Sequence, residues 1–221
     1  MRRQMTDFSN FASTIEDLCD LDFCDGGHQL PEAANADVPE KLRAIFPPPY
    51  FEWWRAQESG DSVVYSHVEA TLSKLEAQIA SRGPYDGYLG FSQGGSVAHL
   101  LTLLSLRAPE AHKGIPPPRF GVYLSARATR HDAHLEMVNA AAATPLPLPS
   151  LVIYGGRDNE VPPELTKEMM QTLDPSQRTE LFMPEGTHRI PKLNEEQQGI
   201  VRGFFEAQLA AKAGERGGGG S

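Results

Sequence analysis

The chain has 221 residues, of which 40% are hydrophobic and 22% are charged, an ordinary composition for one globular domain. Its formal net charge of −9 argues against nucleic acid or an anionic membrane surface as a partner. No apolar run is long enough to span a bilayer, and the polar residues that follow Met1 do not have the pattern of a secretory signal.

The first part of the chain gives few signals of regular structure. Residues 21–23 are a candidate for a short strand, and an irregular stretch follows to about Gly60. Cys19 and Cys24 are the only cysteines, too few for a disulfide scaffold and without the spacing of a zinc site. We therefore predict free thiols in a reducing compartment, a cytoplasmic protein and no bound metal.

Aromatic residues and prolines are concentrated in the irregular stretch, at residues 45–54. Long loops inside a compact domain are usually functional or disordered, and aromatic residues argue against disorder. In one interpretation Phe46, Tyr50, Trp53 and Trp54 bind substrate as the walls of an acyl or alkyl pocket. In the other they fill the core beneath the loop. The two interpretations are about equally supported, and we expect the two tryptophans to divide between them.

Helix and strand signals alternate along the rest of the chain. Apolar residues at helical spacing from Val64 to Ile79 predict an amphipathic helix that ends at Gly83-Pro84. Buried strands follow at residues 88–89, 120–124, 151–154 and 181–183, with helices at 93–106, 132–143 and 163–173. This alternation predicts an α/β fold, a mostly parallel sheet with helices on both faces.

The end of the chain predicts one more helix and a tail. Asn194 and Gln197 are a candidate N-cap pair for a helix that carries the apolar residues Val201, Phe204, Phe205 and Leu209. The Gly-rich end cannot offset the entropy of its own ordering. We expect a single domain over residues 1–212 and a flexible tail over residues 213–221.

A Gly-Phe-Ser-Gln-Gly-Gly sequence occupies residues 90–95, between a predicted strand and an apolar helix. A nucleophilic serine stands on a sharp strand-to-helix turn and needs small residues two positions before and two after it. Gly90 and Gly94 take these positions around Ser92, and the backbone N–H of Gln93 is placed to bind an oxyanion. The alternative is a Gly-rich turn without chemistry.

Two later loops carry the base and the carboxylate that a nucleophilic serine needs. Asp158 follows one buried strand, and His188 lies in the loop after the last strand. The order Ser92, Asp158, His188 is that of α/β-hydrolases, whose three loops meet at one edge of the sheet. A loop Asp or His by itself is more often a cap or a solvated side chain. The competing histidine, His99, is at helical spacing after the serine, where packing is the commoner role.

Several motifs together carry a resemblance to a known family. They are Phe23-Cys24-Asp25-Gly26, the proline–aromatic run at 45–50 with Trp53, and residues 83–87 leading into the Gly-Phe-Ser-Gln-Gly sequence. From about Asp22 to Phe205 the chain resembles the fungal, plant and animal family of small serine hydrolases, the FSH or ovarian-cancer-associated group. The proline–aromatic loop is most similar to plant and algal members.

The resemblance implies an α/β-hydrolase fold with a triad of Ser92, Asp158 and His188. It also implies carboxylesterase activity on short to medium acyl esters, without a cofactor. The chain departs from the family at its beginning, because members open with a buried strand ending in Leu-His-Gly that nothing here matches. In the family the loop after that strand supplies one oxyanion-hole N–H, so Gln93 is left as the remaining donor.

The missing strand has consequences for stability and for activity. In the family it lies beside the strand that leads to the serine, so its loss is expected to leave unpaired edges and a marginally stable chain. The chain is then either a shortened form of a family member with impaired turnover or an inactive relative.

Together these features predict a serine hydrolase that cleaves small carboxylic esters through an acyl-enzyme. An acyl-thioesterase-like enzyme is the nearest alternative, since that group carries the same Gly-Phe-Ser-Gln-Gly sequence. A non-catalytic protein that holds a hydrophobic ligand is the alternative from another class.

Overall fold

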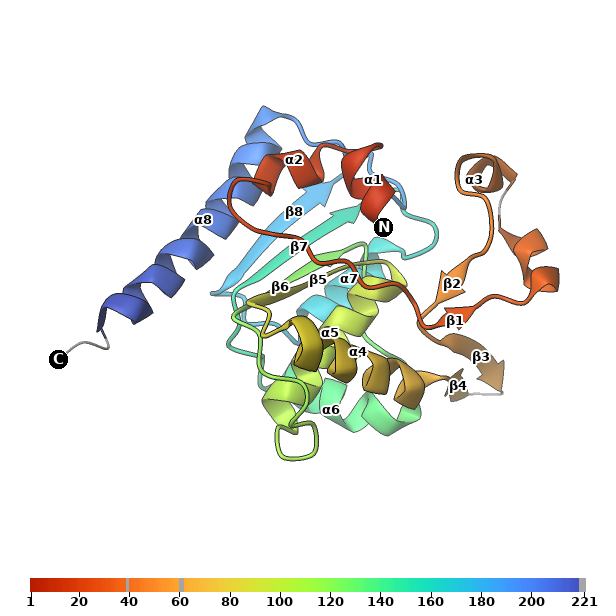
Figure 1. The fold of residues 1–221 in the computed structure, drawn as a ribbon, viewed down its shortest axis with the longest axis horizontal. Coiled ribbons are helices and arrows are strands. Elements are labelled where there is room, and N and C mark those ends of the chain that lie inside the picture. Colours follow the sequence, from red (N-terminus) through yellow and green to blue (C-terminus); the bar gives the residue numbers. More distant parts are fainter. Residues whose placement is uncertain (39, 60–61, 219–221) are drawn as a thin grey trace.

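The structure, a computed structural model, describes residues 1–38, 40–59 and 62–218 and is built around a parallel β-sheet (Figure 1). All pairings in this sheet are parallel, so the carboxyl ends of its strands meet at one edge. Among the described residues it has four strands, hydrogen-bonded in the order β5 (Gly87–Phe91), β6 (Phe120–Leu124), β7 (Ser150–Gly155) and β8 (Arg178–Met183). The strands predicted in the second half of the chain are therefore confirmed.

Each crossover between consecutive strands of this sheet contains a helix, as the alternating sequence signals predict. These helices are, in chain order, α5 (Gln93–Arg107), α6 (Asp132–Ala143) and α7 (Pro163–Met170). Helix α6 agrees with the predicted range, whereas α7 ends before residue 173. It ends early because Leu173 forms a parallel bridge with Leu146, which draws the chain out of the helix.

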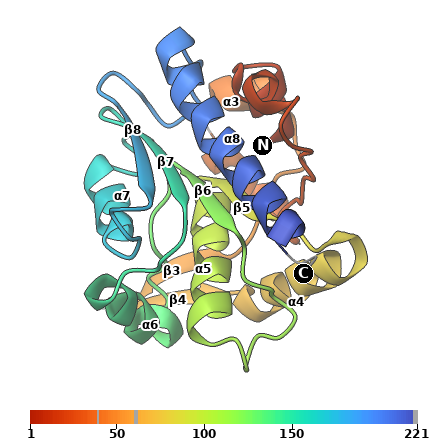
Figure 2. The ribbon, with the colours of Figure 1, turned by 90° about the vertical axis from the view of Figure 1, so that its left-hand side faces the viewer.

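Helices cover both faces of the sheet (Figures 1 and 2). Side chains of a strand alternate between faces, so Val122 and Leu124 lie in one core cluster and Tyr123 in the other. The first cluster is closed by α1 (Arg2–Thr6), α2 (Phe11–Ile15) and α8 (Glu195–Gly218), and the second by α4 (Val68–Arg82), α5, α6 and α7. The predicted α/β fold with helices on both faces is confirmed.

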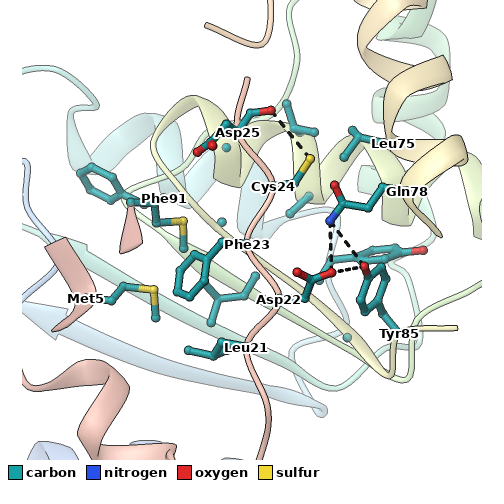
Figure 3. Close-up of a pocket in the computed structure, with 18 of the residues that line it drawn as sticks. Met5, Leu21, Asp22, Phe23, Cys24, Asp25, Leu75, Gln78, Tyr85 and Phe91 are labelled. Atoms are coloured by element: carbon teal, nitrogen blue, oxygen red, sulfur yellow. Dashed lines mark hydrogen bonds between the residues drawn. The ribbon is translucent and has the colours of Figure 1, made fainter. Parts of the chain in front are cut away.

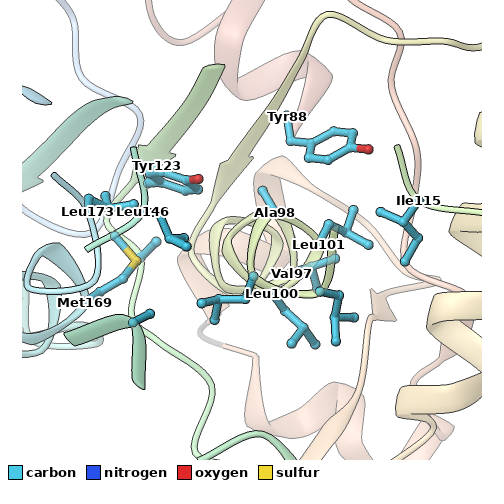
Figure 4. Close-up of a cluster of buried hydrophobic side chains, with 14 of the residues drawn as sticks. Tyr88, Val97, Ala98, Leu100, Leu101, Ile115, Tyr123, Leu146, Met169 and Leu173 are labelled. Atoms are coloured by element: carbon cyan, nitrogen blue, oxygen red, sulfur yellow. The ribbon is translucent and has the colours of Figure 1, made fainter. Parts of the chain in front are cut away.

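Helix α5 is the most deeply buried helix of the second cluster. Figure 4 shows it with Val97, Leu100 and Leu101 around its axis, between Tyr123 of β6 and Ile115. Leu100 has no exposed surface, and a fully buried leucine contributes roughly 2 kcal/mol to folding through the hydrophobic effect. This packing fixes the helix, and with it the turn that joins β5 to α5.

The first sixty residues contain more regular structure than the sequence predicts. Strand β1 (His28–Gln29) pairs antiparallel with β2 (Phe51–Glu52), and a 3-10 helix, η1 (Glu32–Asp37), and α3 (Glu40–Ile45) lie between them in the chain. A second antiparallel pair follows, β3 (Arg55–Ser59) with β4 (Ser62–Ser66). The strand predicted at residues 21–23 is absent, because this extended segment has no strand beside it to pair with. Gly60, the predicted end of the irregular stretch, lies outside the described residues.

Val64 was predicted to be the first apolar position of a helix, and that prediction is wrong. It lies in β4 with 54% of its surface exposed. His67, with a φ of 70°, breaks the chain direction between β4 and α4, so the helix begins at Val68. From there the prediction holds, since α4 ends at Arg82, just before Gly83.

The last helix begins as the sequence predicts. The Asn194 N–H donates to Gln197 Oε1, and the Gln197 N–H donates to Asn194 Oδ1, each at 2.9 Å, which is the reciprocal pattern of a capping box. Val201, Phe204 and Phe205 are buried as predicted, but Leu209 is 49% exposed, because it lines the cavity beside the outer edge of β5. Helix α8 continues to Gly218, into the segment predicted as a tail, and residues 219–221 lie outside the described part.

No described strand pairs with the outer edge of β5. A cavity of about 1350 Å³ extends along this edge, between residues 86–94 on one side and residues 18–26 on the other (Figure 3). Residues 20–26 make no backbone–backbone hydrogen bond to any other described residue. Helices α1 and α2 do not replace the strand, because Met5 and Phe11 pack onto the face of the sheet. The expected unpaired edge is therefore present, and it borders the turn that carries Ser92.

An apolar strand of about five residues, the length of β5, added upstream is expected to stabilise the protein. Such a strand would form backbone hydrogen bonds with β5, each contributing roughly 1 kcal/mol, and would fill apolar space in the cavity. Thermal and urea unfolding of both chains measures the effect. A control extension with prolines at successive positions lacks the backbone donors of the ladder and should raise the midpoint much less. Equal stability of the chains with and without the apolar extension would show that the β5 edge does not accept a strand.

Candidate active site

Ser92 lies on the turn between β5 and α5, at the carboxyl edge of the sheet. Its backbone has φ 55° and ψ −125°, a region that residues other than glycine rarely adopt. The Ser92 N–H donates to the Leu124 carbonyl at 2.9 Å, and the Ser92 carbonyl accepts from Gly95 and Ser96 in the first turn of α5. Strained conformations of this kind persist where the surroundings hold them, and they are common at active sites.

The glycines around Ser92 differ in what they do. A Cβ at Gly90 would collide with the Gly94 carbonyl, and a Cβ at Gly95 would lie only 2.5 Å from the Ala126 Cβ. A Cβ at Gly94 would meet no atom closer than 3.4 Å. The sequence pattern assigns the small positions to Gly90 and Gly94, but the tight contacts in this turn are at Gly90 and Gly95.

The structure brings Ser92, His188 and Asp158 together in one hydrogen-bonded line. His188 Nε2 lies 2.9 Å from Ser92 Oγ. His188 Nδ1 lies 2.8 Å from Asp158 Oδ2 and 3.0 Å from Oδ1. With the Nδ1–H donating to the carboxylate, Nε2 is the acceptor that faces the serine hydroxyl. This arrangement can remove a proton from Ser92 and return it to a leaving group.

Asp158 is held in place by its own loop. Its Oδ1 accepts the N–H of Glu160 at 3.0 Å and the N–H of Val161 at 2.8 Å, so the turn after β7 closes on the carboxylate. The Asp158 side chain is fully buried, whereas the His188 side chain is 21% exposed. The carboxylate is thus shielded from water, and the imidazole is left accessible to a substrate.

The loop that carries His188 is tied to the loop that carries Asp158. The Gly156 N–H donates to the Met183 carbonyl and the Arg157 N–H donates to the Gly186 carbonyl, each at 2.8 Å. The ring of Phe91 lies against the imidazole of His188, with 4.8 Å between ring centroids. Sequence reasoning did not assign Phe91 to the site, although its position directly before the serine is a signal for it.

His99, the competing histidine, lies away from this line of residues. It has no exposed surface, and its Nε2 lies 2.7 Å from Thr172 Oγ1 while its ring packs against Tyr123. Burial lowers its pKa from 6.5 to about 4, because the charged imidazolium is not solvated there. His99 is therefore a neutral core residue at neutral pH and cannot reach Ser92 as a base.

We expect His99 to reduce the stability of the fold in mild acid. Its folded pKa, about 4, lies below its unfolded pKa, so the unfolded chain binds the proton first. The free energy of unfolding is then highest above about pH 6.5. It decreases as the pH falls toward 4, by up to about 3 kcal/mol. Urea unfolding at pH 7, 6 and 5 should show this decrease in the native protein and a smaller one in His99→Leu. Identical pH profiles would show that His99 does not titrate in this way.

Gln93 is the first residue of α5, so its backbone N–H has no acceptor within the helix. Its side chain has a separate role. Gln93 Oε1 accepts the Trp53 N–H at 2.7 Å, and Gln93 Nε2 donates to the Trp54 carbonyl at 2.8 Å. One side chain therefore connects the serine turn to the aromatic loop, a connection that sequence reasoning missed.

The predicted aromatic residues divide between the cavity and the core. Phe46, Tyr50 and Trp53 line the cavity that Ser92 also lines. Trp54 does not line it, because only 3% of its surface is exposed and its ring stacks on Tyr65 within the core. The assignment of Trp54 to substrate binding is therefore corrected, and the expected division between the two tryptophans is observed.

Neither a membrane-spanning helix nor a metal-binding cluster is found among the described residues. None of their helices is both long enough and apolar enough to cross a membrane. No three of their His, Cys, Asp and Glu side chains gather in a group that could hold a metal ion.

Comparisons with known proteins show the family of the chain. The sequence profile of a family described as serine hydrolase (FSH1) matches residues 2–200. The chain is 25% identical to mouse esterase OVCA2, covering 86% of this chain and 83% of that protein, and 27% identical to human esterase OVCA2, covering 80% and 78%. It is 32% identical to an uncharacterized hydrolase of Schizosaccharomyces pombe, covering 63% of this chain but only 31% of that protein.

Solved structures with a similar fold include acyl-protein thioesterase 2 of Zea mays, with a TM-score of 0.48 and 18% identity, covering 73% of this chain and 74% of that one. SOBER1 of Arabidopsis thaliana has a TM-score of 0.43 and 18% identity, covering 65% of each chain.

Proposed function

The chain belongs to the serine hydrolase (FSH1) family, and we propose that it cleaves carboxylic esters with Ser92, His188 and Asp158 as its catalytic triad. The observation that carries the proposal is the continuous line of contacts from Ser92 Oγ through both imidazole nitrogens to the Asp158 carboxylate. These contacts join three loops distant in sequence at the carboxyl edge of the sheet, where α/β-hydrolases place their triad.

In the first half of the reaction Ser92 Oγ attacks the ester carbonyl carbon while His188 Nε2 takes its proton. The buried Asp158 stabilises the imidazolium that forms and keeps the ring oriented. The carbonyl oxygen becomes an oxyanion, which the Gln93 N–H at the start of α5 stabilises. The tetrahedral intermediate then collapses, and His188 gives its proton to the departing alcohol, leaving an acyl group on Ser92.

In the second half a water molecule replaces the alcohol. His188 removes a proton from this water as it attacks the acyl carbonyl, and then returns the proton to Ser92 Oγ as the carboxylic acid leaves. The partial exposure of His188 supports this step, since water can reach Nε2 once the alcohol has left.

The substrate is proposed to be a small-molecule ester with a short to medium acyl chain. The cavity beside Ser92 supports an apolar acyl group, because Phe46, Tyr50 and Trp53 line it. Thioesters with the same acyl groups undergo the same chemistry and are the natural comparison in an assay.

Hydrolysis of p-nitrophenyl esters from acetate to dodecanoate, with the matching thioesters alongside, tests this function. We expect turnover of the esters with an optimum at short to medium chains. Preference for thioesters would support the acyl-thioesterase alternative. Binding of the acyl chains without turnover would indicate a hydrophobic-ligand-binding relative instead.

A further inference from the structure

Trp53 is fixed beside the serine turn by its backbone. Its N–H donates to Gln93 Oε1 at 2.7 Å, and its carbonyl accepts from the Thr71 hydroxyl of α4. The next carbonyl, that of Trp54, accepts from Gln93 Nε2. Three hydrogen bonds thus anchor the backbone at this point of the aromatic loop to α4 and to the first residue of α5.

The Trp53 indole N–H lies against the first turn of α5. Its Nε1 would be 3.4 Å from a Cβ placed on Gly94, two residues after the nucleophile. Trp53 lines the same cavity as Ser92 and Gln93 and is half-buried. No described residue accepts a hydrogen bond from Nε1. This donor is therefore available to a ligand in the cavity that Trp53 lines.

An oxyanion at this site needs more than the donor already described. The charge develops beside the start of α5, where Gln93 supplies one N–H, and removing one of two such donors typically lowers turnover by 10²–10³. A hydrogen bond from the indole N–H to a charged oxyanion is stronger than one to the neutral ester carbonyl, so it favours the tetrahedral state over the ester.

We propose that Trp53 Nε1–H is the second oxyanion donor of this site, acting together with the Gln93 N–H. This inference rests on the proposed function, because it concerns the oxygen of the intermediate formed on Ser92. Trp53 then contacts the reacting atoms and is a catalytic residue, and the Gln93 side chain becomes a positioning group that holds the backbone from which the indole extends.

Kinetics of Trp53→Phe give the first test. Phenylalanine keeps an aromatic ring on the cavity wall but removes the N–H, so we expect kcat to fall by about 10²-fold with KM nearly unchanged. Trp54→Phe is the matched control, because it removes an indole N–H from a ring buried against Tyr65, outside the cavity. A higher KM with unchanged kcat in Trp53→Phe would mean that the ring only binds substrate, and would overturn the proposal.

Indole NMR of the unsubstituted protein gives a second test that does not depend on how the variant folds. The chain has two tryptophans, so ¹⁵N labelling gives two indole signals, and Trp54→Phe assigns them. A fluorophosphonate adduct on Ser92 places a tetrahedral phosphonyl oxygen where the oxyanion forms. We expect the Trp53 N–H signal to move downfield on adduct formation and the Trp54 signal to stay in place.

Different results of this experiment would contradict the proposed function and the role of Trp53. A protein that forms no adduct contradicts the proposed function, and with it this inference. A protein that forms the adduct while the Trp53 signal does not move leaves the function standing and overturns the role of Trp53.

Discussion

Replacing Ser92 with alanine is expected to lower kcat/KM for a p-nitrophenyl ester by on the order of 10⁵, because no other group in the site can form the acyl-enzyme. The variant should fold normally. Ser92 Oγ contacts His188, but the hydrogen bonds that hold the turn come from its backbone N–H and carbonyl, which alanine keeps. The thermal midpoint should therefore change little. Initial rates measure the loss of activity in Ser92→Ala relative to the unsubstituted protein, and thermal unfolding measures the change in stability.

A matched control for this substitution is Ser96→Ala. Ser96 lies one turn along α5 and is buried, so the change is chemically the same but away from His188. The Ser96→Ala variant should retain most of the esterase activity. Hydrolysis that survives in Ser92→Ala, after correction for contaminating esterases, would show that another residue is the nucleophile.

His188→Ala is expected to be about as inactive as Ser92→Ala, because the serine hydroxyl cannot attack efficiently without a base. Residues that act as one unit are not additive, so the double variant should lose little beyond either single variant. Steady-state rates of the three variants, with the folded fraction of each, are the measurement.

His99→Gln is the control histidine variant, since His99 lies in the core and makes no contact with the site. Its activity per folded molecule should stay near that of the unsubstituted protein. An active His188→Ala together with an inactive His99→Gln would reverse the assignment of the base.

The second half of the fold could be predicted from sequence because its signals are local. Residues 120–124 are an uninterrupted apolar run between turn residues, and residues 132–143 are a helix closed by a series of prolines. The capping pair Asn194 and Gln197 identifies the start of α8 within a few positions. In each case the information lies inside the element.

The first sixty residues could not be predicted in the same way. The pairing of β1 with β2 joins His28 to Glu52, and such two-residue strands carry no periodic signal of their own. Val64 fits the helical spacing of α4, but His67 adopts a positive φ and separates it from the helix. Leu209 also fits its helix, yet it faces the cavity beside β5 and stays half exposed, which periodicity does not show.

The candidate site also contains some features that the sequence predicts and others that it does not. The order and loop context of Ser92, Asp158 and His188 can be read from the sequence, and the structure places the three within hydrogen-bonding distance. The contacts of the Gln93 side chain cannot be read, since its partners are backbone groups about forty residues away. Backbone donors and acceptors are the same at every residue, so no sequence pattern marks them.

The measurement that tests the central claim most directly is fluorophosphonate labelling followed by intact mass and peptide mapping. Such probes react with serines activated by a neighbouring base, and the claim is that His188 and Asp158 activate Ser92. We expect one adduct per chain, located on the peptide that contains Ser92 and absent from His188→Ala. An unlabelled native protein, or an adduct on any other serine, would contradict the claim.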